Sequence, residues 1–219
     1  STQTITAAKQ LSVNIGCNYE EVGIEESVKL TDSQIEGLTE FMLQNVQARD
    51  RSSRILAAIA AKVGGAFTCN ANKSEMTVGY TTLYGDLGGY LAPIADLWKT
   101  QVYEMARFFN ENIKPIIPIE SIDVKPSAEL SDSQDVTKGL GDPMVYEYHD
   151  CLFKSWVERW NRATLEDILT WALEDRLESE IGYKGNIAEL FNTYCNPSIE
   201  GSKILCPTKR FIVDVDYWW

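Results

Sequence analysis

AFTCNANKSEMTVGYTTLYGDLGG, residues 66–89, determines how we interpret the fold of this sequence. The first five residues, AFTCN, are too short for a helix, follow Gly65 and end at Asn70, so they predict a short buried β-strand. A helical pattern that ends at a pair of glycines precedes them, and a polar loop follows. Helix, glycine pair, strand and loop in succession are typical of a doubly wound α/β fold.

The residues on either side predict further elements. We expect a helix over residues 4–15 that ends at Gly16, because apolar residues recur there at helical spacing. We also expect a strand in 18–26, a helix from the caps Thr31 and Asp32 to 63 with a buried apolar part at 54–63, and a helix from the cap Asp96 to 109. A Pro-broken near-strand is expected in 114–122. From 144 onward we expect helices, with a capping box at Thr164 and Asp167, and then a strand or extended tail at 209–219.

This pattern predicts two parts of one domain. Residues 1–143 carry the alternation of helices and short strands, and residues 144–219 read as helical. At 219 residues the chain is long enough for one sizeable core, or for a core with an appended helical part.

Composition excludes several classes of protein. The net charge of −12 at pH 7 argues against nonspecific binding to nucleic acid, because no basic patch offsets repulsion from phosphate. The five cysteines form no CxxC pair and His149 is the only histidine, which argues against a structural zinc site. Reduced thiols in a cytoplasmic protein are the simplest interpretation. No apolar run reaches the ~20 residues of a membrane span, and we expect neither a signal peptide nor a membrane partner.

Three polar clusters after the predicted strand suggest a site. In open α/β sheets ligands bind at the carboxyl ends of the strands, which is where the loop 70–75 would lie. Glu75 is placed to hold a magnesium ion, which typically takes one or two carboxylates together with phosphate oxygens. The turn GDLGG at 85–89 could close over a ligand. Lys99, at the start of the next predicted helix, could neutralise phosphate.

NVQARDR (45–51), NKSEMTVGYTTLYGDLGGYLAPIADLWKTQVYEMA (72–106) and KPSAEL (125–130) together resemble the ammonia-using synthetase domain of NAD synthetases, especially the glutamine-dependent kind. The resemblance covers residues 1–150 well and the remainder weakly. It implies an adenine nucleotide alpha-hydrolase-like (ATP pyrophosphatase) fold. It also implies a reaction, in which ATP adenylates the nicotinate carboxylate of deamido-NAD and ammonia, free or from glutamine, displaces AMP.

The resemblance also implies roles for individual residues. Glu75 matches the carboxylate associated with magnesium and ATP, and Lys99 is its catalytic partner. Lys99, Ser127 and Asn70 match residues that contact ATP. Asp86 matches the acid on the loop over deamido-NAD. Asn45 and Arg49 match positions that hold deamido-NAD from the neighbouring subunit's side, which implies a homo-oligomer, a dimer or larger.

Two features of the family are not found in this sequence. One is the pyrophosphate loop Ser-Gly-Gly-x-Asp-Ser, and the other is the glutaminase domain. We therefore expect a truncated synthetase, with a sheet incomplete at its N-terminal side and little turnover by itself. The tail CPTKRFIVDVDYWW also departs from the family, so no substrate contact is carried over to Lys209 or Arg210. Two other hypotheses stay open: a non-catalytic assembly module, and another ATP pyrophosphatase-type amide ligase that makes GMP or asparagine.

Each candidate residue has a plainer interpretation beside the functional one. Glu75 could favour a helix dipole from the first turn, Lys99 could be a solvated helix residue, and Asp86 could serve only the turn. Arg49 could pair with Asp50 or Glu40 on an exposed helix. The plainer interpretation is preferred for His149, as a structural residue, for the tryptophans 156, 160 and 171, as packing or a subunit contact, and for the cysteines, which have no partner base for a nucleophilic role.

Overall fold

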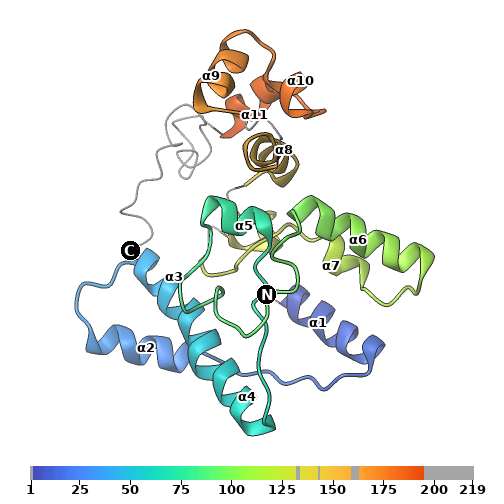
Figure 1. Ribbon diagram of the computed structural model, residues 1–219. Helices are drawn as coiled ribbons and strands as arrows, with labels where there is room; N and C mark the ends of the chain where they lie inside the picture. The colour runs from blue at the N-terminus through green and yellow to red at the C-terminus, as the bar shows by residue number, and fades with distance from the viewer. Residues whose placement is uncertain (1, 132–133, 143, 159–162, 195–219) are drawn as a thin grey trace. The chain divides into compact units, whose positions relative to one another are not determined.

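Helices make up nearly all of the regular structure in the computed structural model (Figure 1). The structure describes residues 2–131, 134–142, 144–158 and 163–194. The chain divides into two compact units, Ser1–Asp142 and Pro143–Trp219. Among the described residues, no helix is long and apolar enough to cross a membrane.

The first unit opens as the sequence predicts and then departs from it. Helix α1 (Thr2–Ile15) ends at Gly16, whose φ of 72° lies in the left-handed region that glycine adopts without strain. The strand expected in residues 18–26 is wrong. Residues 17–24 have no regular structure, and Glu25 begins helix α2 (Glu25–Gln34). Two acidic residues in the first turn of α2 favour the positive end of its dipole, which explains why this acidic segment becomes helical.

The long helix expected from Thr31 to residue 63 is broken near its start. Thr31 and Asp32 lie inside α2, and Gly37, with φ 82°, separates α2 from α3 (Glu40–Arg49). The cap of α3 is Thr39, whose hydroxyl accepts the Met42 amide at 3.3 Å. Helix α3 continues through a π-helical segment, η1 (Asp50–Leu56), into α4 (Ala57–Val63), which Gly64 ends in the left-handed region (Figure 1).

The apolar segment 54–63 is not buried, contrary to the prediction. Val63 is 68% exposed and Leu56 38% exposed, and no residue of α4 is buried. An all-round apolar pattern predicts burial only where neighbouring elements surround the helix, and α4, which continues directly from η1, has no buried residue.

The strand predicted at AFTCN is reduced to one bridge. Thr68 forms an isolated parallel bridge with Leu91. Two backbone hydrogen bonds accompany it, from Tyr90 N to Phe67 O and from Cys69 N to Leu91 O, both at 2.9 Å. The segment that pairs with AFTCN is short because it lies between the 82–89 turn and Pro93, which has no N–H to donate. Since no regular strand occurs among the described residues, the doubly wound sheet stays a prediction.

The remaining elements of the first unit are short helices around one longer one. They are α5 (Lys73–Val78), α6 (Lys99–Asn112), α7 (Ile119–Asp123) and the 3-10 turn η3 (Val136–Lys138). Helix α6 packs against α5 and α7, and α7 against α1. The near-strand expected in 114–122 is therefore partly helical. Asp96 does not cap α6, since its side chain is 99% exposed and pairs with Lys73 at 3.2 Å.

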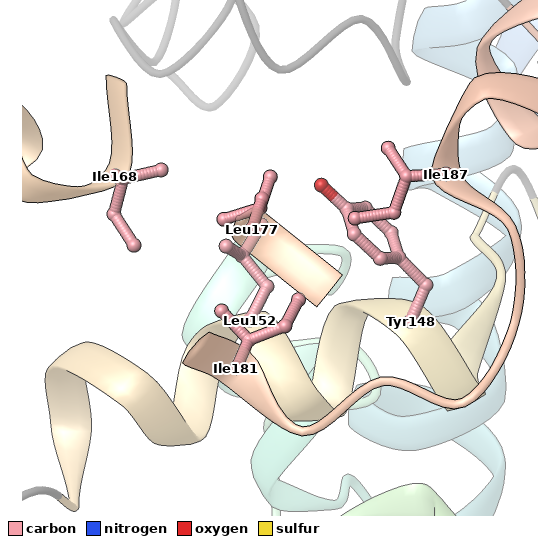
Figure 2. Close-up of a cluster of buried hydrophobic side chains, with 6 residues drawn as sticks. All are labelled: Tyr148, Leu152, Ile168, Leu177, Ile181 and Ile187. Carbon is pink, nitrogen blue, oxygen red and sulfur yellow. The ribbon is translucent and has the colours of Figure 1, made fainter. Parts of the chain in front are cut away.

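The second unit is helical, as its periodicity predicts. Helices α8 (Tyr146–Val157), α9 (Leu165–Leu173), α10 (Leu177–Ile181) and α11 (Ile187–Tyr194) succeed one another. Figure 2 shows the apolar cluster that they share, formed by Tyr148, Leu152, Ile168, Leu177, Ile181 and Ile187. The capping box at Thr164 and Asp167 is present. The predicted tail at 209–219 lies outside the described residues, as do Trp160, Cys195 and Cys206.

The helices of the second unit show the surroundings of His149, Trp156 and Trp171, for which a structural or packing role is the plainer interpretation. His149 packs edge-on to Tyr148 in α8, and its Nδ1 lies 2.8 Å from the Val145 carbonyl, so its surroundings are those of a structural residue. Trp156 and Trp171 pack against the apolar cluster of the second unit. Both observations agree with a packing role.

Candidate functional site

Glu75 and Lys99 lie in direct contact. The Lys99 Nζ is 3.1 Å from Glu75 Oε1, and the two side chains are only 19% and 17% exposed. The other carboxylate oxygen of Glu75 accepts the Asn72 amide at 3.0 Å, while the Asn72 side chain accepts the Glu75 amide at 3.1 Å. Glu75 therefore has two structural roles: it is the N3 residue of a capping box on α5, and it is the ion-pair partner of Lys99.

The chain folds locally so that the starts of α5 and α6 meet. The Lys99 amide donates to Ser74 Oγ at 2.9 Å, and the Lys73 amide donates to the Leu97 carbonyl at 2.9 Å. Ser74 and Trp98 are fully buried, and the Lys73 ammonium lies 5.1 Å from the centre of the Trp98 ring. These contacts bring Glu75 and Lys99 together although 24 positions separate them, and they correct our prediction that residues 70–75 are all loop.

Asn45 and Asp86 are joined through one residue, Thr82. The Thr82 hydroxyl donates to Asn45 Oδ1 at 2.9 Å, and the Thr82 amide donates to Asp86 Oδ1 at 2.8 Å. Thr82 is buried, at 8% exposure. Two residues that the resemblance assigns to deamido-NAD, one on α3 and one in the turn after α5, are thus parts of one hydrogen-bonded unit.

The turn that follows Thr82 is held along one face of α3 and η1. Arg49 Nε donates to the Leu83 carbonyl at 3.1 Å, and Ser53 Oγ donates to the Tyr84 carbonyl at 2.6 Å. Together with Asn45, these side chains are spaced four residues apart and lie on the same side of the helix. Within the described residues, Arg49 forms no ion pair with Asp50, the partner that its plainer interpretation supposed, because Asp50 pairs with Arg54.

The glycines of this turn allow close packing. A Cβ added at Gly85 would lie 3.1 Å from the Ala48 side chain, and one at Gly89 would lie 2.3 Å from the Cys69 amide nitrogen. The Cys69 thiol in turn donates to the Asp86 carbonyl at 3.2 Å. The turn at 85–89, which the sequence predicts could close over a ligand, is therefore packed against α3 and the Thr68 bridge in this structure.

Ser127 and Asn70 have local partners. Ser127 Oγ donates to the Gln134 carbonyl at 2.6 Å and accepts the Glu129 amide at 3.1 Å. Gln134 is buried, and its Nε2 donates to the Tyr80 hydroxyl at 2.5 Å. Ser127 is thereby connected to the segment between Glu75 and Thr82. Asn70 accepts the Thr68 hydroxyl at 2.9 Å, and no hydrogen bond within the described residues joins it to the other candidates.

The charged groups of the site influence one another. Partial loss of water around Asp86 raises the pKa of its carboxyl, although the residue is exposed at the surface; the Thr82 amide opposes this rise, and Glu75 adds to it. Burial also raises the pKa of the Tyr80 hydroxyl, and the nearby Asp142, Asp86 and Glu75 raise it further. Partial loss of water lowers the pKa of the Arg51 guanidinium, although this residue is exposed at the surface, and Asp86 opposes that change. These residues therefore belong to one acidic neighbourhood.

The donor set fits a magnesium ion only together with a phosphate ligand. Within the described ranges no group of three or more His, Cys, Asp or Glu side chains is arranged to hold a metal. Glu75 is a single carboxylate, and both of its oxygens already have partners. Magnesium commonly takes one or two carboxylates, water and phosphate oxygens, so one carboxylate beside a nucleotide is sufficient for it.

Our sequence interpretation missed Thr82, Tyr80 and Gln134. Thr82 and Tyr80 lie within the quoted GYTTLYGD, but nothing in the pattern distinguishes Thr82 from Thr81. Gln134 follows KPSAEL by four residues and has no neighbour in the sequence that marks it. Only the folded arrangement shows that these three residues connect the candidate site residues to one another.

Comparison with known proteins gives consistent results. A family model described as NAD synthase matches residues 1–181. A glutamine-dependent NAD(+) synthetase from Synechocystis is 40% identical over 145 residues, which are 64% of this chain and 26% of that protein. The chain thus spans about a quarter of the length of the curated relatives it matches.

Two solved structures share the fold. An NMN synthetase from Francisella tularensis aligns with a TM-score of 0.60 at 21% identity, covering 83% of this chain and 68% of that one. A glutamine-dependent NAD+ synthetase from Acinetobacter baumannii, in complex with ADP, aligns with a TM-score of 0.53 at 22% identity, covering 92% of this chain and 36% of that one. At these identities the likeness concerns the fold alone.

Proposed function

The chain belongs to the NAD synthase family, and from that premise we propose that it takes part in the ATP-dependent amidation of deamido-NAD to NAD. In this proposal ATP adenylates the nicotinate carboxylate and pyrophosphate leaves. Ammonia, supplied free or from glutamine, then displaces AMP to form the amide. We also propose the adenine nucleotide alpha-hydrolase-like fold for it, with a doubly wound Rossmann-type sheet that is incomplete at its N-terminal side.

The contact between Glu75 and Lys99 is the observation that carries this proposal. The two side chains are each more than four-fifths buried and form an ion pair. The geometry of this pair depends on the contact between the first turns of α5 and α6. The pair contributes little to a core, but it can separate when polyphosphate and a cation arrive, because Lys99 can turn to phosphate and Glu75 to the cation.

The remaining candidates divide between the two substrates. Lys99, Ser127 and Asn70 would contact ATP, whereas Asn45, Arg49 and Asp86 would hold deamido-NAD. The hydrogen bonds between Asn45, Thr82 and Asp86 support the second group, because they place those side chains in a fixed relation. Preorganised groups of this kind lower the barrier by positioning the reacting atoms.

Glu75 would hold magnesium together with the ATP phosphates. When bound, the ion would neutralise charge that develops on the phosphate oxygens during adenylation. The Asn72 amide keeps one oxygen of Glu75 oriented in the meantime. We further propose a homo-oligomer, a cytoplasmic location, and no nucleic-acid or membrane partner.

The proposal is tested by measuring NAD formed from deamido-NAD, ATP, magnesium and either ammonium or glutamine. The assay uses the whole protein that the gene encodes and, in parallel, the 219 residues alone. We expect NAD from the whole protein. We expect slow turnover from the 219 residues, because no Ser-Gly-Gly-x-Asp-Ser loop is among them to hold pyrophosphate. No NAD from the whole protein would refute the proposed function.

Two variants of Glu75 distinguish its proposed role in adenylation from its role in capping α5. Glu75→Gln keeps an oxygen that can accept the Asn72 amide but removes the charge, so we expect adenylation to fall at least ~100-fold with the fold intact. Glu75→Ala removes the cap as well and should additionally cost about 1 kcal/mol of folding free energy. Adenylation by Glu75→Gln at the wild-type rate would mean that Glu75 serves only α5.

The alternative functions predict other results. If the protein were a GMP- or asparagine-forming ligase, xanthosine monophosphate or aspartate would compete with deamido-NAD in the assay, and we expect neither to do so. A non-catalytic assembly module would show no turnover in the whole protein. Light scattering at micromolar concentration tests the homo-oligomer, and a strict monomer would contradict that part of the proposal.

A further inference from the structure

We infer that Thr82 is a positioning residue for the dinucleotide, acting through Asn45 and Asp86 without being one of the residues assigned to the substrate. The inference rests on the proposed function, because it takes Asn45 and Asp86 as the residues that hold deamido-NAD. It adds the claim that one buried hydroxyl sets the orientation of the Asn45 amide, and that this orientation determines affinity for one substrate only.

The Thr82 hydroxyl binds the carbonyl oxygen of the Asn45 side chain. It donates to Asn45 Oδ1 at 2.9 Å, and one hydrogen of Asn45 Nδ2 is directed to the Phe41 carbonyl at 3.2 Å. A primary amide has two N–H groups and one carbonyl. Asn45 therefore has a single N–H left to offer a ligand, which suits an oxygen of a phosphate, carboxylate or ribose.

The backbone of the same residue orients the Asp86 carboxylate. The Thr82 amide donates to Asp86 Oδ1 at 2.8 Å, which favours the ionised form against the loss of water that raises the pKa of this carboxyl. A donor on Asn45 and an acceptor on Asp86 are thus separated by one buried residue. A ligand that carries both an oxygen and a hydroxyl group can match such a pair, as the ribose and phosphate portions of a dinucleotide do.

Removing the Thr82 hydroxyl should leave the turn in place. Arg49 and Ser53 still bind the carbonyls of Leu83 and Tyr84, and Gly85 still packs against Ala48. The Thr82 amide also remains, so Asp86 keeps its contact. The specific loss is the hydrogen bond to Asn45 Oδ1, so that within the described residues the contact with the Phe41 carbonyl alone still orients the Asn45 side-chain amide.

Steady-state kinetics of the whole protein with three variants tests the inference. Thr82→Val keeps the shape and removes the hydroxyl, and we expect KM for deamido-NAD to rise about fivefold, with KM for ATP unchanged. Thr82→Ser restores a hydroxyl and should recover most of the affinity. Thr81→Val is the matched control, because the Thr81 hydroxyl has no hydrogen-bond partner within the described residues; it should behave as wild type.

A double-mutant cycle with Asn45→Ala shows whether Thr82 acts through Asn45. If it does, Thr82→Val has no further effect on KM once Asn45 has been replaced. Additive effects, or equal rises in KM for ATP and deamido-NAD, would overturn the inference and leave Thr82 a purely structural residue. So would an unchanged KM in Thr82→Val when the wild type makes NAD. A wild type that makes no NAD refutes the proposed function itself, and the inference falls with it.

Discussion

Buried polar side chains hold this candidate site together. Asn72 and Ser74 are almost completely buried, Thr82 and Gln134 nearly so, and each makes a hydrogen bond to a neighbouring segment or cap. Leaving a buried polar group without a partner is expensive, so each such residue strongly restricts how its neighbours are placed. At the residue scale, the positions of Glu75, Asn45 and Ser127 follow from these buried residues.

Asp86 should make stability depend on pH. Its pKa is raised above the ordinary 3.8, chiefly because the folded protein partly removes water from the carboxyl. The folded state then holds the proton more tightly than the unfolded state does. This group's effect is therefore absent at pH below 3.8 and becomes fully destabilising once the pH has risen through the raised pKa.

Asp86→Asn should remove that cost while its oxygen still accepts the Thr82 amide. We expect the variant to be more stable than the wild type in urea at pH 7, with a difference that shrinks toward pH 4, and to lose affinity for deamido-NAD. Asp32→Asn, at an exposed position on α2, controls for the general effect of net charge. An equal gain in the free energy of unfolding at pH 4 and pH 7 would show that ionised Asp86 does not destabilise the folded protein.

At the scale of elements, the contact between the 82–89 turn and the side of α3 and η1 that carries Asn45, Arg49 and Ser53 fixes the position of Asp86. The turn approaches the Thr68 bridge closely enough that no side chain fits at Gly89, and it approaches α3 closely enough that a Cβ at Gly85 would be tight. Ser53, in the π-helical segment η1, contacts the turn as Arg49 on α3 does. Helix and turn therefore position Asp86 jointly.

Gly89→Ala should disrupt this contact. The new Cβ would lie 2.3 Å from the Cys69 nitrogen, and Gly89 has φ 148°, which alanine rarely adopts. We expect a loss of about 1–3 kcal/mol in the free energy of unfolding, with faster hydrogen exchange at the Cys69 and Tyr90 amides. Gly23→Ala, where nothing lies within 4 Å of the new Cβ, is the control and should change little. Unchanged exchange at both amides would contradict this account of the turn.

At the scale of the molecule, the two units are stabilised differently. The second unit has an apolar cluster shared by four helices (Figure 2). Several buried apolar residues of the first unit are small, such as Ala7, Ala48 and Ala71, and side-chain hydrogen bonds connect its segments. The candidate site residues all lie in the first unit.

Leu152→Ala should therefore separate stability from binding. Leu152 is 2% exposed, and truncating it should cost about 2–5 kcal/mol of folding free energy in the second unit. Binding of ATP to the first unit should be unaffected in calorimetry below the unfolding temperature. Leu173→Ala, at an 85% exposed position, is the control for both measurements. Loss of ATP affinity in Leu152→Ala would show that the second unit supports the site.

The sequence by itself predicted what depends on short-range chemistry and on family motifs. Helix α1 and its glycine stop, the helical second unit and the capping box at Thr164 follow from local spacing and are confirmed. Membership of the NAD synthase family was recognisable in NKSE and GYTTLYGD, whereas the roles of individual residues and the division into domains stay predictions.

Only the tertiary structure decided how distant residues meet. The exposure of α4, the reduction of AFTCN to one bridge, and the failure of Asp96 to cap α6 depend on what packs nearby, which local pattern does not encode. The same holds for the links through Thr82 and Gln134, which join segments 37 and 54 positions apart. A threonine hydroxyl has the same propensities at positions 81 and 82, and the fold alone buries Thr82 and gives its hydroxyl the partner Asn45.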